Sequence, residues 1–130
     1  MTVRALVLDD QGVLSRAEPG MLAVARSARR QGLRTALLSN AEGSTHPYGD
    51  LFDVAVLSGE AGLRKPDVEV FLLCARRLGV RPGECVVVDD LAANVRGAAA
   101  AGMTGVLHTS VAATVAELAV LTGLDLGTRS

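Results

Sequence analysis

The chain has 130 residues, 49% of them hydrophobic, so it is long enough to bury one core and too apolar to be disordered. Its net charge of -1, from 13 basic and 14 acidic side chains, gives no surface that attracts polyanions. One Tyr, two Phe and no Trp are too few for a stacking platform that binds single-stranded nucleic acid. The apolar run at the start is too short for a signal peptide, and no segment is long enough to span a bilayer. We expect one domain, residues 1–130, that is cytoplasmic and binds neither nucleic acid nor membranes.

Five short runs rich in Val, Leu and Ala predict buried strands. They lack a strict alternation of apolar and polar residues, which is typical of parallel strands covered on both faces. In chain order the runs are residues 3–9, 34–39, 53–58, 85–89 and 104–109.

Helical patterns lie between the strands. In the first two, apolar residues recur at spacings of three and four, with arginines on the other side. These residues are Met21, Val24, Ala25 and Ala28, then Phe71, Cys74, Ala75 and Leu78. Gly32 and Gly79 are placed to end these helices, and Pro66 suits the first turn of the second. An Ala-rich helix is predicted over 92–102, and a last helix over 111–122.

Two segments depart from this alternation. Residues 40–50 are rich in turn formers and carry no helical period, so we expect a loop with at most one short helical turn. Residues 125–130 are expected to be a frayed tail. The rest predicts an α/β fold, in which right-handed crossovers give a five-stranded parallel sheet with helices on both faces.

Two cysteines and two histidines have no spacing that indicates chemistry. Cys74 and Cys85 match neither a metal site nor a redox motif, so we expect two reduced, buried thiols, although sequence leaves a pairing open. His46 lies in the 40–50 loop and His108 follows the fifth predicted strand. We expect both to be ordinary solvent-exposed side chains.

Polar side chains gather where the predicted strands end, the place at which open parallel sheets bind ligands. The four clusters are Asp9-Asp10-Gln11-Gly12, Ser39-Asn40, Arg64-Lys65-Pro66 and Asp89-Asp90. Together they offer a carboxylate that can attack phosphorus and carboxylates that suit Mg²⁺. They also offer a hydroxyl, an amide and a lysine that can hold a phosphoryl group. Solvation or helix capping explains each cluster alone as well, but their conjunction favours phosphoryl transfer.

The stretches that carry these clusters resemble the four motifs of the haloacid dehalogenase superfamily of phosphohydrolases. "VLDDQGVL" is similar to the first motif, "TALLSN" to the second, "SGEAGLRKPDVEVF" to the third and "CVVVDDLAANVRGAAAAGM" to the fourth. The resemblance covers about residues 3–107. It implies a Rossmann-like domain, a Mg²⁺ cofactor and hydrolysis of a phosphorylated substrate, of unknown identity, through an aspartyl-phosphate.

The same resemblance implies a role for individual residues. Counting three residues back from Gly12 makes Asp9, rather than Asp10, the nucleophile. The implied phosphate ligands are Ser39, Asn40 and Lys65, the metal ligands are Asp9, the Gln11 backbone carbonyl and Asp90, and the supporting residues are Asp89 and Asn94. Lys65 would also act in catalysis by balancing charge, and Asp89 is placed to pair with it.

Three features depart from the usual pattern of the family, and one is the 40–50 loop, where members usually have a longer helical segment. Most phosphatases of this type have an aspartate where this chain has Gln11, and an amide cannot transfer a proton at neutral pH. General acid–base help is worth roughly 10²–10⁴-fold, so we expect a slow enzyme. Asp10 should not replace the missing acid, because neighbouring strand residues face opposite sides; we expect it to be solvated or to cap a helix. The stretch between Asp9 and Ser39 has room for a turn and one helix, so we expect no cap domain.

Two functions from different classes remain open. The first is a capless, magnesium-dependent phosphohydrolase. The second is a catalytically impaired binding or scaffold module that keeps the fold and the phosphate site. A protein partner or self-association that completes the open crevice fits either. A response-regulator receiver is excluded, because no predicted strand end between Asp10 and Ser39 offers an aspartate.

Overall fold

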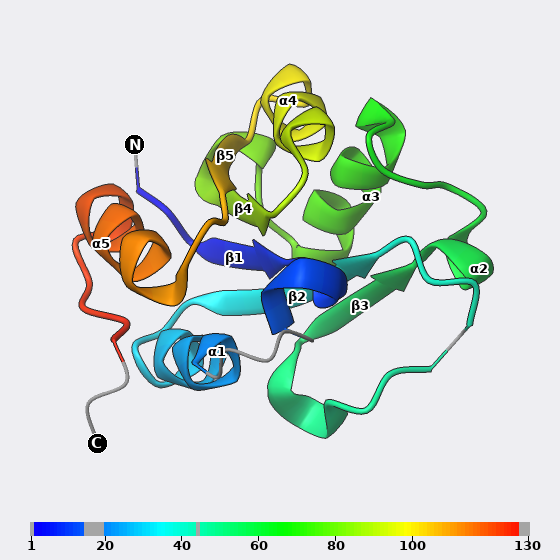
Figure 1. The fold of residues 1–130 in the computed structure, drawn as a ribbon. Coiled ribbons are helices and arrows are strands. Elements are labelled where there is room, and N and C mark those ends of the chain that lie inside the picture. The colour runs from blue at the N-terminus through cyan, green and yellow to red at the C-terminus, as the bar shows by residue number, and fades with distance from the viewer. Residues whose placement is uncertain (1, 15–19, 44, 128–130) are drawn as a thin grey trace.

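The computed structural model of the chain describes residues 2–14, 20–43 and 45–127. Its centre is a five-stranded parallel sheet in the order β3-β2-β1-β4-β5 (Figure 1). The strands are β1 (Ala5–Leu8), β2 (Arg34–Ser39), β3 (Val54–Leu57), β4 (Cys85–Asp89) and β5 (Thr104–Leu107). Each predicted range contains the observed strand, so the predicted Rossmann-like α/β fold is confirmed.

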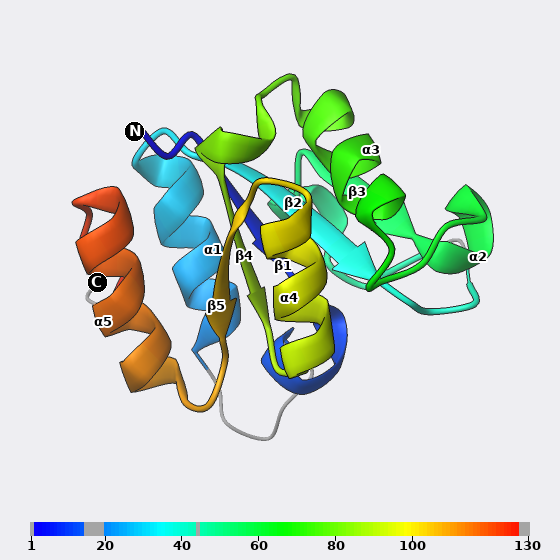
Figure 2. The same cartoon turned by 90° about the horizontal axis from the view of Figure 1, so that it is seen from above.

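Helices cover both faces of the sheet. They are α1 (Met21–Arg30), α2 (Ser58–Ala61), α3 (Val68–Leu78), α4 (Ala92–Ala100) and α5 (Val111–Thr122). Helices α1 and α5 lie on one face, and α3 and α4 on the other (Figures 1 and 2). Between β1 and β2 the described residues form only a turn, Asp10–Leu14, and α1, which agrees with a capless fold.

Alternate residues of each strand feed two apolar layers, because successive strand side chains point to opposite faces. Leu6 and Leu8 of β1 pack toward α1 and α5, where Val24 and Leu118 are fully buried. On the other face, Val7 belongs to a layer with residues of α3 and α4, among them Phe71, Cys74 and Ala98. Burial on both faces explains why the strands show no alternation of apolar and polar residues.

Three predictions about the helices and the tail are wrong. Helix α3 begins at Val68 after the N-cap residue Asp67, so Pro66 precedes the helix instead of lying in its first turn. The short helix α2 has no counterpart in the predicted elements, because four residues are too few to show a helical period. The tail is not frayed where it is described, because Leu126 is fully buried and the Asp125 carbonyl accepts a hydrogen bond of 2.7 Å from Gln31 Nε2. Residues 128–130 lie outside the described residues.

Other local predictions can also be compared with the structure. The 40–50 loop contains the beginning of one short 3-10 turn, Gly49–Leu51, as predicted. Cys74 and Cys85 are both buried and free, which confirms that interpretation. His108, by contrast, is buried, and its Nδ1 lies 2.7 Å from Thr114 Oγ1. Within the described part of the chain, no helix has the length and apolar character needed to cross a membrane.

Candidate active site

The carboxyl ends of β1, β2 and β4 surround a pocket of about 420 Å³. Parallel strands place their carboxyl ends along one edge of the sheet, which is why clusters far apart in sequence meet here. The pocket is lined by Asp9, Gln11, Gly12, Ser39, Asn40, Arg64, Lys65, Asp90, Leu91 and Asn94. Of the residues implied by the sequence, only Asp89 is absent from this lining, because it is completely buried beneath it.

A buried lysine links two of the strand ends. The Lys65 Nζ lies 2.8 Å from Asp9 Oδ1 and 2.7 Å from Asp89 Oδ2. The side chain of Lys65 is 2% exposed, and those of Asp9 and Asp89 are 9% and 0% exposed. Charges this deeply buried are tolerated only when they are paired. The pairing expected between Lys65 and Asp89 is present, and the same ammonium group also holds Asp9.

Asp89 is fully engaged by the protein itself. Its Oδ2 accepts a second hydrogen bond, of 3.1 Å, from Asn94 Nδ2, and its Oδ1 accepts one of 3.0 Å from the backbone N–H of Leu91. Asn94 is itself buried and comes from the first turn of α4. Asp89 therefore holds the Lys65 ammonium in place and connects the end of β4 to the start of α4 by hydrogen bonds.

The hydrogen bonds that the structure gives for the Asp9 carboxylate are all to one oxygen. Its Oδ1 accepts hydrogen bonds from Lys65 Nζ at 2.8 Å and from the backbone N–H of Asp10 at 2.9 Å. Burial raises the pKa of Asp9 to about 6, and the Lys65 ammonium acts against this rise. The carboxylates of Asp89 and Asp90 raise the pKa by smaller amounts. The group is thus largely ionised at neutral pH, and no hydrogen bond to Oδ2 is given by the described residues.

The side chain of Asn40 holds the backbone of the lysine. Its Oδ1 accepts a hydrogen bond of 2.8 Å from the N–H of Lys65, and its Nδ2 donates one of 3.1 Å to the Lys65 carbonyl. The amide assigned to a phosphoryl group from the sequence is therefore committed to Lys65. Ser39, which is 3% exposed, accepts a hydrogen bond from the N–H of Ala41 at 3.2 Å. A hydroxyl that accepts one bond still has its O–H to donate.

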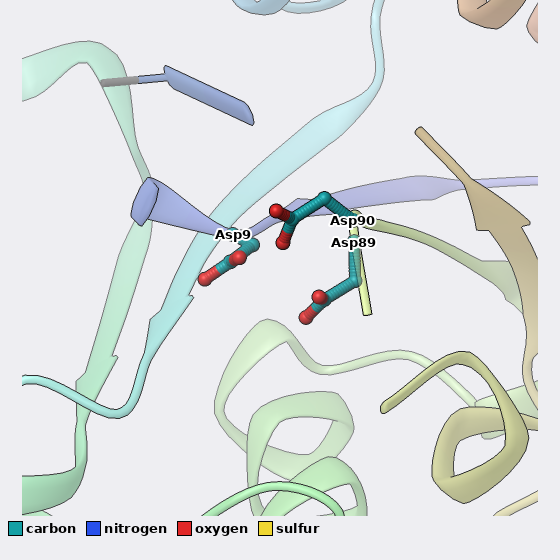
Figure 3. Close-up of side chains that lie close together, drawn as sticks. All are labelled: Asp9, Asp89 and Asp90. Atoms are coloured by element: carbon teal, nitrogen blue, oxygen red, sulfur yellow. The ribbon is translucent and has the colours of Figure 1, made fainter. Parts of the chain in front are cut away.

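Three carboxylates at the ends of β1 and β4 could hold a cation. Oxygens of Asp9, Asp89 and Asp90 all lie within 4.8 Å of one another (Figure 3). A Cβ added at Gly12, whose φ is +82°, would lie 2.0 Å from Asp90 Oδ2, so the turn leaves room for this carboxylate only because it has a glycine there. Because Asp89 is engaged elsewhere, Asp9 and Asp90 are the two carboxylates that can reach a cation. Their hard oxygen donors fit Mg²⁺.

The Asp10 side chain has its contacts outside the pocket. It does not line the pocket, and its Oδ1 accepts a hydrogen bond from the Tyr48 hydroxyl. It is therefore not simply solvated, which was one of the two roles expected for it. His46, which was expected to be solvent-exposed, is half-buried; its Nδ1 accepts the N–H of Tyr48 at 3.2 Å and its ring stacks on that of Tyr48.

Sequence reasoning missed Tyr48 and the pocket residue Leu91. The side chain of Leu91 is 57% exposed at the pocket rim. Its position directly after the strand-end acids is a signal that could have identified it, because such positions border the ligand crevice. No sequence signal pairs Tyr48 with Asp10, which are 38 positions apart.

Comparisons with known proteins agree with this geometry. Residues 4–102 match the family described as haloacid dehalogenase-like hydrolase. The sesquiterpene phosphatase astK of Aspergillus oryzae is 31% identical over 115 residues, which cover 83% of this chain and 59% of that protein. The chain spans between 11% and 59% of the length of three curated relatives that it matches.

Solved structures show the same fold. An uncharacterized protein from Corynebacterium glutamicum superposes with a TM-score of 0.86 at 32% identity, over 94% of this chain and 96% of that one. A HAD family enzyme from Bacteroides thetaiotaomicron, solved in complex with magnesium and inorganic phosphate, has a TM-score of 0.56 at 23% identity, over 66% of this chain and 49% of that one. The second likeness concerns the fold alone.

Proposed function

We propose that the chain, which belongs to the haloacid dehalogenase-like hydrolase family, is a magnesium-dependent, capless phosphohydrolase. In this proposal Asp9 attacks a phosphoester and carries an aspartyl-phosphate. The observation that carries it is the convergence of Asp9, Ser39, Lys65 and Asp90 on one pocket. A relative named as a phosphatase supports it, and so do the carboxylates of Asp9 and Asp90, whose oxygens suit Mg²⁺.

The chemistry would take two steps at Asp9. In the first, Oδ2 forms a bond to phosphorus while the bond from phosphorus to the leaving oxygen breaks, and that oxygen takes the electron pair. In the second, water attacks the phosphorus, the bond to Asp9 breaks, and inorganic phosphate is released. Lys65 keeps the attacking group ionised by lowering its pKa against the effect of burial.

Residues around Asp9 would hold the phosphoryl group. Ser39 donates its O–H to one of its oxygens, and Lys65 balances its charge. Asn40 would contribute through its backbone N–H, because its side-chain amide holds Lys65. The carboxylates of Asp9 and Asp90 and the backbone carbonyl of Gln11 would bind Mg²⁺, which supplies positive charge next to the phosphoryl oxygens when bound.

Gln11 limits both steps, because an amide can neither protonate the leaving oxygen nor take a proton from the attacking water. It lines the pocket, but its amide has no proton to give to a leaving alkoxide. The leaving oxygen must then be stable as an anion or take its proton from water that enters the open pocket. This residue is also the observation that favours the second candidate, a binding module that keeps the phosphate site without turnover.

Beryllofluoride, which mimics a phosphoryl group on a carboxylate, tests the proposal without knowledge of the substrate. We expect a bound fluorine NMR signal that requires Mg²⁺, is lost in Asp9→Asn and is retained in Asp10→Asn. Asp10 is the matched control because it is the adjacent carboxylate and does not line the pocket. Turnover of acetyl phosphate that is lost in Asp9→Asn would then establish the hydrolase. A bound signal without turnover of any phosphoester would support the binding module, and no bound signal from folded protein would overturn the proposal.

A further inference from the structure

Arg64 is a cation at the pocket that the proposed chemistry does not use. It lies next to Lys65 in sequence and lines the same pocket. Its side chain is 58% exposed, and its NH1 lies 3.7 Å from Glu42 Oε1, on a side chain that is 87% exposed. That distance is too long for a hydrogen bond, and exposed pairs of this kind contribute little stability. A ligand anion could therefore replace Glu42 at small cost.

The other cation at the pocket cannot serve the same purpose. Among the described residues that line the pocket, the basic ones are Lys65 and Arg64. Lys65 is 2% exposed and its ammonium is held between two carboxylates at 2.7 and 2.8 Å. It can balance the transferred phosphoryl group but cannot extend to a more distant charge. Arg64 is the group left to meet negative charge elsewhere on a substrate.

The pocket has room for such a substrate. Its volume of about 420 Å³ falls in the range typical of small-molecule sites. The phosphoryl group belongs beside Asp9, so the leaving part of the substrate must extend outward, toward the rim that Arg64 and Leu91 border. A guanidinium has a planar fork of donors that matches a carboxylate or a phosphate with two parallel hydrogen bonds.

We propose that Arg64 binds a second anionic group on the leaving part of the substrate. The substrate class is then a small phosphomonoester that carries another phosphate or a carboxylate. This inference rests on the proposed function, because it assumes that the phosphoryl group is bound at Asp9.

Binding of non-hydrolysable phosphonates tests the inference without any turnover. The probes are propylphosphonate, 3-phosphonopropionate and propane-1,3-bisphosphonate, which share a three-carbon chain and differ in the second group. Calorimetric titration in the presence of Mg²⁺ should show that wild-type protein binds at least one of the two probes with a second anionic group about tenfold more tightly than propylphosphonate. This is the gain expected from one partly exposed charged hydrogen-bonding pair. The carboxylate and bisphosphonate arms show which anion is preferred.

Two variants separate a local effect from a change in net charge. Arg64→Gln should bring the affinity ratio close to one. Arg26→Gln removes the same charge from an exposed position on α1 and should leave the ratio unchanged. A ratio near one in the wild type, a ratio that survives Arg64→Gln, or no binding of any probe would overturn the inference. If the wild type shows the affinity ratio, Arg64→Gln loses it and no phosphoester is turned over, the anion site is supported and the hydrolase is refuted. If phosphoesters are turned over but the wild type shows no affinity ratio, the anion site alone is refuted.

Discussion

Replacing Lys65 by Met should destabilise the protein strongly, because it leaves two buried carboxylates without their cation. The Lys65 Nζ lies 2.8 and 2.7 Å from Asp9 and Asp89, and none of the three side chains is more than 9% exposed. Removing one partner of a buried ion pair typically costs about 3–5 kcal/mol. Since whole domains have about 5–15 kcal/mol of stability, we expect a fall in the midpoint of thermal unfolding of roughly 10–20 °C.

The loss should depend on pH in a defined direction. Without the ammonium, the pKa of the Asp9 carboxyl should rise further above its value in the unfolded chain, because the opposing charge is gone. A raised carboxyl pKa destabilises the folded state increasingly as pH rises through the unfolded value and above it. The cost of Lys65→Met should therefore be larger at pH 8 than at pH 5. Urea unfolding of wild type and variant in the absence of Mg²⁺, followed by circular dichroism, measures both values.

The neighbouring arginine provides the control. Arg64→Met removes the same charge from a side chain that is 58% exposed, and surface changes of this kind stay within about 0.5 kcal/mol. A cost below about 1 kcal/mol for Lys65→Met at pH 8, or a cost equal to that of Arg64→Met, would refute the reasoning, because it would mean that the buried pair does not hold the strand ends together.

Three further predictions concern the turn after β1 and the buried thiols. Gly12→Ala should lower Mg²⁺ affinity, measured by calorimetry, by about tenfold or more, because its Cβ would lie 2.0 Å from Asp90 Oδ2 and displace that carboxylate. Gln11→Asp should raise kcat on alkyl phosphates, up to the roughly 10²–10⁴-fold that a general acid supplies, and no gain would show that the missing acid is not what limits the rate. Burial raises the pKa values of the Cys74 and Cys85 thiols to about 12 and about 11, so iodoacetamide at pH 8.5 should label both in urea and neither in the native protein.

The sequence was sufficient to predict the sheet and the meeting of polar clusters, for a physical reason. Each cluster directly follows a strand or lies a short loop beyond it, and parallel strands bring their carboxyl ends to one edge. Backbone topology therefore places Asp9, Ser39 and Asp90 around one pocket, independently of their side-chain conformations. The spacing of apolar residues fixes α1 and α3 in the same way, because each helix must turn one stripe toward the sheet.

The partners of individual side chains could not be predicted, because they depend on loops that have no period. Asn40 bonds the backbone of Lys65 across 25 positions, which turns a predicted phosphate ligand into the support of another residue. Tyr48 reaches Asp10 from a loop that the sequence identifies only by its turn formers. Leu126 follows the last helix and is buried against the layer that contains α1 and α5 residues, a contact that composition alone cannot reveal.

The substitution at Gln11 affects one function of an otherwise connected site. Its backbone carbonyl is unchanged by the side chain, and the buried network of Lys65, Asp9 and Asp89 does not include it. In the proposed reaction, attack on phosphorus and charge balance would therefore remain, whereas Gln11 could neither protonate the leaving oxygen nor accept a proton from the attacking water. A leaving group that is stable as an anion needs no proton, so the missing acid should slow the first step mainly for esters of poorly acidic alcohols. The missing base should slow the release of phosphate from Asp9 for every substrate. The proposed hydrolase should therefore cleave acyl phosphates and other esters of acidic leaving groups fastest, and it differs from the binding module in whether water can hydrolyse the aspartyl-phosphate without a protein base.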